Sequence, residues 1–261
     1  MQNRYIADLG DFGKYGLLRN LCGKAESEKG LSLGVLWYLV PDESHNEDGK
    51  YISYLNRSRE NDLRFRECDE DLYDKLRAII KSGERNIRQI KNSRVLPEWT
   101  IYFEEPLCYD ELPILNPETR KKRLRLRNYW VEAGLNKTIN CDLIFVDPDN
   151  GLQVKSVERH HNKATKYAYY EELLPIIQRG QSLIVYHHLC RNGTASKQIE
   201  ERLSHIEEYC GIKDSYALLY KRGTLRAFII VPSEMHKKLL IERSIRTIIN
   251  WNEHFELIKR G

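Results

Sequence analysis

The stretch Leu143–Gly151 constrains the fold more than any other part of the chain, because an apolar run stops abruptly at a charged, turn-forming cluster. Four consecutive apolar residues suit a strand that is covered on both faces. The letters that follow, Asp-Pro-Asp-Asn-Gly, are ordinary turn formers. In open α/β sheets, ligands bind beyond the carboxyl ends of the strands. We therefore expect Asp147 and Asp149 to face a site at the edge of a parallel sheet.

Strand-like and helix-like patterns alternate after this run. The expected elements are a strand at 142–147, a helix at 167–178, a strand at 182–187, a helix that stops at Cys210–Gly211, and a hairpin of 215–220 with 225–231. Strands that alternate with helices imply a parallel sheet. We predict a three-layer α/β fold with a mostly parallel sheet and a C-terminal antiparallel hairpin.

The remaining segments have weaker patterns. We expect a loop entering a helix over residues 3–19 with Asp11 as its cap, strands within 31–40 and 99–103, helices within 71–90, and a terminal helix over Ser233–Ile258 with an interruption near Trp251. No internal repeat is apparent. We predict one domain over residues 1–261, with a mainly helical insertion around 60–95.

Composition bounds the class of protein. The 261 residues are 41% hydrophobic, which is enough for one sizeable core. Six cysteines are scattered without a CxxC pair, which argues against a zinc ribbon and a secreted disulfide scaffold. No stretch reaches the roughly 20 apolar residues that span a bilayer. We expect a cytoplasmic protein with reduced thiols and no membrane partner.

The basic residues are distributed unevenly, although the formal net charge is only +4. The residues that form the densest cluster are Arg120, Lys121, Lys122, Arg123, Arg125 and Arg127. Such a cluster attracts phosphates, and the rings of Tyr129 and Trp130 that follow could stack on bases. A solvated helical face with Trp130 anchored in the core explains the same letters. Nucleic acid is therefore the predicted partner, with a structural role as the alternative.

Two motifs resemble a known superfamily. The order of strand with acidic turn, helix, strand, helix and hairpin resembles the second half of S-adenosylmethionine-dependent methyltransferases of the Rossmann-like superfamily. Asp147-Pro148-Asp149-Asn150 aligns with the Asp/Asn-Pro-Pro-aromatic motif of its amino-methyltransferases. Gly10-Asp11-Phe12-Gly13-Lys14-Tyr15 looks like the opening of the ribosomal-RNA adenine-N6 methyltransferase family, where this segment helps to hold the cofactor.

This resemblance implies a Rossmann-like protein that uses S-adenosylmethionine and acts on an exocyclic amine of nucleic acid. Asp147 and the Pro148 carbonyl would accept hydrogen bonds from that amine, so positioning would carry most of the catalysis. Asp149 and Asn150 stand where the family has proline and an aromatic residue. The residues expected near the cofactor are Gly10, Lys14, Tyr15, Pro41, Asp42 and Glu43.

Two other functions fit the same residues. Asp147 and Asp149 form an acidic pair that could hold magnesium or manganese, with His187 and His188 as acid, base or ligand in a nuclease or phosphoesterase. The pair resembles the first motif of haloacid-dehalogenase-like phosphatases, and also the acids of topoisomerase-primase domains, with Glu104 or Glu105 as the separate glutamate. The third function is a noncatalytic nucleic-acid-binding module.

Overall fold

A mixed sheet forms the centre of the computed structural model, which describes residues 1–23, 30–42, 49–113, 116–251 and 253–260. Its strands are β1 Leu33–Trp37, β2 Ile101–Phe103, β3 Leu143–Asp147, β6 Ser182–His188, β7 Tyr216–Tyr220, β8 Arg226–Val231 and β9 Phe255–Lys259. They follow the order β2-β1-β3-β6-β8-β7-β9. Neighbouring strands are parallel from β2 to β6 and antiparallel from β6 to β9. β4 Gly151–Leu152 and β5 Tyr167–Ala168 pair separately.

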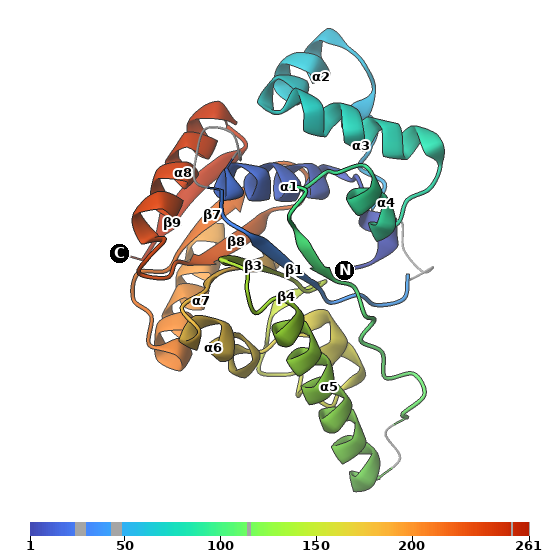
Figure 1. Ribbon diagram of the computed structural model, residues 1–261, viewed down its shortest axis with the longest axis vertical. Helices are drawn as coiled ribbons and strands as arrows, with labels where there is room; N and C mark the ends of the chain where they lie inside the picture. Colours follow the sequence, from blue (N-terminus) through green and yellow to red (C-terminus); the bar gives the residue numbers. More distant parts are fainter. Residues whose placement is uncertain (24–29, 43–48, 114–115, 252, 261) are drawn as a thin grey trace.

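Helices cover both faces of the sheet (Figure 1). The α-helices are α1 Leu9–Cys22, α2 Arg59–Arg64, α3 Glu70–Ser82, α4 Ile87–Asn92, α5 Pro117–Lys137, α6 Tyr170–Gln178, α7 Ala195–Cys210 and α8 Lys237–Asn250. Short 3-10 turns are η1 Asn3–Tyr5, η2 Ser53–Leu55, η3 Arg66–Cys68 and η4 Asn162–Lys166. The predicted three-layer α/β fold is confirmed, including the hairpin of β7 and β8.

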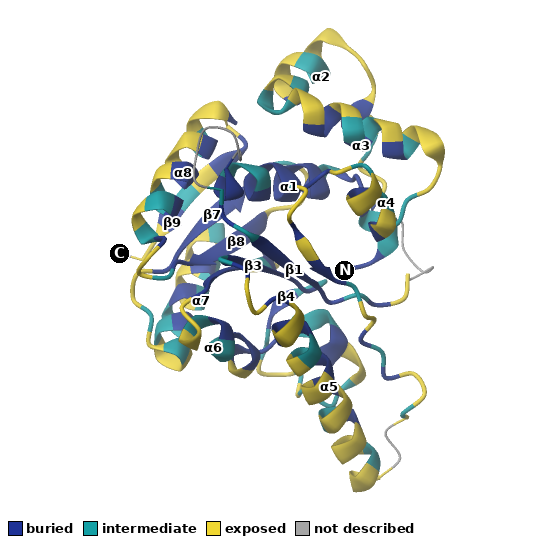
Figure 2. Ribbon diagram, viewed as in Figure 1, coloured by how far each residue is buried: buried dark blue, intermediate teal, exposed yellow. Residues whose placement is uncertain are grey.

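Alternating side chains of the strands feed two separate cores. In β3, Leu143 and Phe145 join the core beneath α1, α3 and α8, whereas Ile144 and Val146 join the core beneath α5, α6 and α7. Every residue of β3 is buried, and Figure 2 shows the central strands as the most buried part of the molecule. Because successive side chains of a strand point to opposite faces, Asp147 lies on the α1 face with Phe145.

Two glycines let α1 pack closely on the C-terminal part of the chain. An added Cβ at Gly13 would lie 2.5 Å from the ring of Tyr220, and one at Gly16 would lie 2.0 Å from the ring of Trp251. Aromatic rings therefore occupy the space that larger side chains would need. The helix begins at Leu9, and its N-cap is Asp8, whose Oδ1 accepts the Asp11 N–H at 2.8 Å. The prediction of Asp11 as the cap was wrong by one helical turn.

The end of the chain differs from the prediction. α8 stops at Asn250 instead of continuing to Ile258, and residues Phe255–Lys259 form β9 at the edge of the sheet. β9 pairs with β7, whose outer edge would otherwise expose unpaired backbone groups. Phe255 and Ile258 are buried in this position. Residues Phe255–Lys259 therefore form a strand that pairs with β7 instead of continuing the predicted helix.

Three helices, α2, α3 and α4, occupy most of the range predicted as a helical insertion between the first two strands.

All six cysteines are free. Among the described helices, none combines the length and the apolarity that a membrane crossing requires.

Candidate functional site

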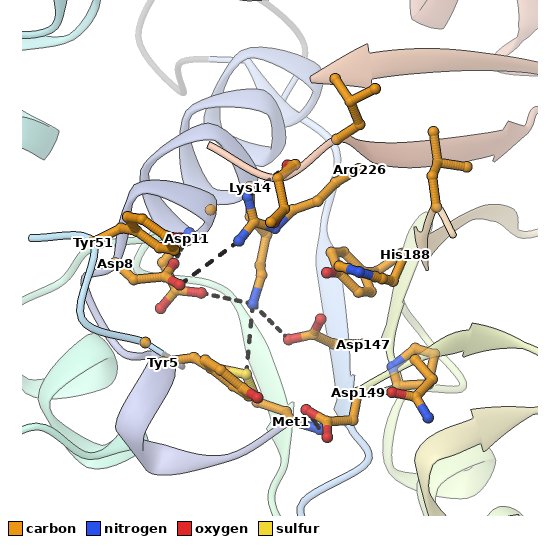
Figure 3. Close-up of a pocket in the computed structure, with 18 of the residues that line it drawn as sticks. Met1, Tyr5, Asp8, Asp11, Lys14, Tyr51, Asp147, Asp149, His188 and Arg226 are labelled. Carbon is orange, nitrogen blue, oxygen red and sulfur yellow. Dashed lines mark hydrogen bonds and ion pairs between the residues drawn. The ribbon is translucent and has the colours of Figure 1, made fainter. Parts of the chain in front are cut away.

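A cavity of about 590 Å³ opens at the edge of the sheet where β3 and β6 end and β8 begins (Figure 3). β3 and β6 are parallel, so their carboxyl ends meet at one edge. β8 runs antiparallel to β6, and its first residue, Arg226, therefore pairs with His188 at the end of β6. The predicted site residues that line the cavity are Gly10, Lys14, Asp147, Pro148, Asp149, Asn150 and His188.

Lys14 joins the two segments that were singled out in the sequence. Its Nζ lies 2.8 Å from Asp11 Oδ1 and 2.8 Å from Asp147 Oδ2, and the three side chains are almost fully buried. The Sδ of Met1 lies 3.7 Å from the same Nζ. Burial alone would lower the pKa of Lys14, but the carboxylates of Asp11 and Asp147 outweigh it and raise that pKa above its ordinary value. The ammonium ion thus fixes Asp147 at the cavity wall.

Asp11 is a cavity acid with a raised pKa. Burial raises its pKa to about 6, Lys14 opposes this rise, and Asp8 adds to it. Its Oδ2 accepts the N–H of Ala7 at 3.1 Å. Ala7 has a φ of 61°, a conformation that costs a non-glycine residue energy, so this turn before α1 is held by its surroundings.

Asp149 is also held by cationic groups. Its carboxylate accepts Gln2 Nε2 at 2.9 Å and lies 3.3 Å from Lys166 Nζ and 3.7 Å from the amino group of Met1. Burial would raise the pKa of Asp149, but that amino group and Lys166 hold it below its ordinary value. Asp149 is therefore ionised at neutral pH. Asp147 pairs with Lys14, and Asp149 pairs with Gln2 and Lys166, so both carboxylates are held by other segments of the chain.

Arg226 closes the cavity on the β8 side. Its Nη2 lies 3.7 Å from Asp8 Oδ2, and its Nη1 donates to the Thr224 carbonyl at 3.0 Å. The guanidinium group packs against Gly10, where an added Cβ would lie 2.4 Å from Cζ. Gly10 is therefore needed for the close approach of α1 and β8. Sequence reasoning missed both Asp8 and Arg226.

The two adjacent histidines face different layers. His188 is exposed and lines the cavity. His187 is buried on the opposite face, where Nδ1 lies 3.1 Å from the Leu152 N–H nitrogen and Nε2 lies 3.2 Å from Arg202 Nε. A neutral imidazole carries one N–H, so only one of these contacts is a hydrogen bond at a time. Burial, assisted by Arg202 and His188, lowers the pKa of His187 to about 3. His187 is thus a neutral core residue outside the cavity.

The predicted cofactor segments are only partly brought together. Gly10 and Lys14 line the cavity, whereas the side chain of Tyr15 is buried in the core beneath α1. Pro41 and Asp42 are exposed and do not line the cavity. The Oδ1 of Asp42 instead accepts the Arg4 N–H at 3.3 Å. Glu43 lies outside the described residues.

The basic helix α5 has two differently used faces. Arg123 and Arg127 are buried, so the prediction that they add to a positive surface was wrong. Arg123 Nη1 donates to the His160 carbonyl at 2.8 Å, and Arg127 Nη2 donates to Glu172 Oε2 at 3.0 Å. These residues and Trp130 recur at helical spacing, which places all three on the inward face. Arg120, Lys121, Lys122 and Arg125 are exposed.

The acids of the cavity do not form a ready-made metal centre. Within the described ranges, the one group of three side chains with closely placed ligand atoms is Glu158, His160 and His161, whose ligand atoms lie within 4.8 Å of one another. None of the three lines the cavity. Glu104 and Glu105, the proposed third acids, do not line it either. Between Asp11 and Asp147, the ammonium group of Lys14 takes the place that a cation would need.

The chemistry of the cavity follows from this arrangement. It offers carboxylates that can bind a cationic group or accept an N–H, and a guanidinium group that can bind an anionic one. No protein-family model matches the chain, and no curated protein matches it either. We therefore infer the function from the geometry of the cavity and from the two sequence motifs that meet there.

Proposed function

We propose that this protein is an S-adenosylmethionine-dependent methyltransferase-like enzyme that acts on nucleic acid at an exocyclic amine. One observation carries the proposal. The two segments on which the resemblance rests, Gly10–Tyr15 and Asp147–Asn150, both contribute to the same cavity, and Lys14 bonds to Asp147 across it at 2.8 Å. The order of β3, α6, β6, α7 and the β7–β8 hairpin supports the same resemblance.

The residues of the cavity fit the groups of this cofactor. A volume of about 590 Å³ lies within the range of small-molecule sites. The negative charge of Asp149 suits a positive sulfonium group, which needs no direct oxygen ligand as a metal ion does, and Arg226 suits the carboxylate. The rings of Tyr5, Tyr51 and Tyr186 supply the apolar surface that an adenine needs. These residues would hold the cofactor.

The chain would then contribute position and proton transfer. When bound, the cofactor supplies a methyl group on a positive sulfur. Asp147 and the Pro148 carbonyl accept the two N–H groups of the target amine and so aim its lone pair. Lys14 keeps the Asp147 carboxylate in one orientation. Asp11, with its pKa raised to about 6 by burial, is suited to receive the proton that the methylated amine releases.

The metal-dependent nuclease has less support. A divalent ion at Asp147 would have to displace Lys14, and one at Asp149 would have to compete with Lys166 and Gln2. The structure offers no observation that favours an ion over these bonded groups. We therefore favour the methyltransferase-like function over the nuclease.

Calorimetric titration with S-adenosylhomocysteine tests the proposal. We expect the wild-type protein to bind, Arg226→Gln, which removes the group assigned to the carboxylate, to weaken binding at least about tenfold, and Asp42→Asn, an exposed control outside the cavity, to bind as the wild type does. Failure of the wild type to bind would contradict the proposal. Manganese-dependent phosphodiester cleavage that Asp149→Asn abolishes would favour the nuclease.

A further inference from the structure

The N-terminal half of α5 projects from the body of the protein. α5 has 21 residues, or about 31 Å at 1.5 Å per residue. β3, into which it leads, has five residues, or about 16 Å. α5 is therefore about twice as long as the strand that follows it. Figure 1 shows its N-terminal half extending away from the strands. We refer to residues Pro117–Tyr129 as the arm.

The inner face of the arm is fastened to the chain that leaves the cavity. Arg123 donates to the His160 carbonyl at 2.8 Å, and Arg127 donates to the Ala164 carbonyl at 2.8 Å. Both carbonyls belong to the segment between the cavity loop and α6. The chain that follows the cavity loop thus forms hydrogen bonds with the inner face of the arm. This segment connects the cavity to the arm.

The outer face of the arm carries exposed cations. The exposed cations on the arm and on its supporting segment are Arg120, Lys121, Lys122, Arg125, Lys155 and Lys163. None of them forms an ion pair with another residue in the described part of the chain. The arm and its supporting segment also carry two exposed acids, Glu118 and Glu158, so the six exposed cations leave an excess of positive charge.

An exposed aromatic ring lies in line with these cations. Lys121, Arg125 and Tyr129 follow one another at intervals of four residues, which places them on one stripe of the helix. The side chain of Tyr129 is 69% exposed. A stripe that joins positive charge with an open ring matches the chemistry of single-stranded nucleic acid, whose phosphates bind cations and whose unpaired bases stack on rings. An anionic lipid surface would attract the same charges, so binding to anionic vesicles is measured beside binding to the strand.

We propose that the outer stripe of the arm is the docking surface for single-stranded nucleic acid. The strand binds through its phosphates to Lys121, Lys122 and Arg125, and one base stacks on Tyr129. Docking stands independently of the cofactor. The further step, in which the docked strand presents a base to the cavity, rests on the proposed function.

Fluorescence anisotropy with a labelled single-stranded 20-mer tests this docking. The triple variant Lys121→Gln, Lys122→Gln and Arg125→Gln is expected to bind at least about tenfold more weakly, with the salt dependence reduced by about two in its logarithmic slope. Tyr129→Ala keeps the charge and is expected to weaken binding by about fivefold or more at any salt concentration. The matched control removes three exposed cations from α3 and α4, namely Lys81, Arg88 and Lys91, each changed to Gln.

The possible outcomes separate the interpretations. Equal losses in the triple variant and its control would mean a net-charge effect, and would overturn the proposal. So would unchanged binding by Tyr129→Ala, or a triple variant that loses only its binding to vesicles of anionic lipid. Circular dichroism confirms that each variant is folded. Docking through the arm by a protein that fails to bind S-adenosylhomocysteine would uphold this inference while refuting the proposed function.

Discussion

The cavity and the arm are the two charge-rich regions of the molecule, and they hold their charges in opposite ways. In the cavity, the side chains of Asp147 and Asp149 are almost fully enclosed, and each pairs with a cation from another segment of the chain. On the outer face of the arm, Lys121 and Arg125 are exposed and without an ion pair in the described structure. Buried paired charges fix the positions of groups, whereas exposed unpaired charges attract a partner.

The largest expected effect comes from removing Lys14. Lys14→Met leaves two carboxylates buried without their cation, and we expect a loss of roughly 3–5 kcal/mol in the free energy of unfolding. The same change on the arm, Lys122→Met, is expected to stay within about 0.5 kcal/mol. Urea denaturation of both variants measures the difference. Equal free energies of unfolding for Lys14→Met and Lys122→Met would contradict the difference between the two regions.

A similar comparison can be made within α5 itself. Arg127→Met breaks a buried pair with Glu172 and the hydrogen bonds to the Ala164 and Tyr167 carbonyls. We expect it to cost about 3 kcal/mol, while Arg125→Met, one half-turn away on the exposed face, costs less than about 0.5 kcal/mol. Thermal unfolding checks this prediction. A stable Arg127→Met protein would mean that the arm does not depend on its inner arginines.

Buried His187 and exposed His188 are neighbours in β6, and they are expected to affect the pH dependence of stability differently. The folded protein lowers the pKa of His187 to about 3, so this histidine stabilises the fold above its unfolded pKa near 6.5. That contribution is lost as the pH falls from about 6.5 towards 3, at up to about 1.4 kcal/mol per pH unit. His187→Gln should therefore flatten the acid limb of the stability curve, unlike His188→Gln at the exposed neighbour. Identical acid limbs for the two variants would contradict the burial of His187.

The smallest expected effect concerns Asp11. Its folded pKa of about 6 exceeds its ordinary value of 3.8, so its protonated form favours the folded state. The resulting stability is fully present below about pH 4 and is lost as the pH rises through about 6. In the wild type, this effect lowers the free energy of unfolding by roughly 1 kcal/mol between pH 5 and 7. Asp11→Asn should remove that pH dependence. Chemical denaturation at the two pH values measures it, and a stability of Asp11→Asn that retains the wild-type slope would refute the assignment.

Local patterns in the sequence predicted the sheet and its edge. The apolar run of β3 and the turn formers after it placed Asp147 and Asp149 correctly at the cavity. Parity within β6 also separates His187 from His188 once the strand is known, because residues Leu183, Val185 and His187 share one face. The spacing of Arg123, Arg127 and Trp130 fits one inward face of α5, but both arginines were predicted to lie on the positive surface, which was wrong.

Other features depended on contacts that no local pattern carries. The bond between Lys14 and Asp147 needs α1 to cross over the end of β3, across 133 residues of sequence. Arg226 reaches the cavity only because β8 runs antiparallel to β6, which brings the start of one strand to the end of the other. β9 was missed because its pairing partner, β7, lies far from it in the chain. The order and direction of the strands, and not the type of residue, place Asp147, Arg226 and β9 where they lie.

We propose that the segments around Lys14 and Asp147 together form a cofactor site. A crystal structure of the protein grown with S-adenosylhomocysteine would show whether they do. We expect density for the ligand in the cavity between Asp11, Asp149 and Arg226, with the bond between Lys14 and Asp147 intact. Ligand density at another place on the protein, or a metal ion seated between Asp147 and Asp149 in crystals that also contain manganese, would contradict it.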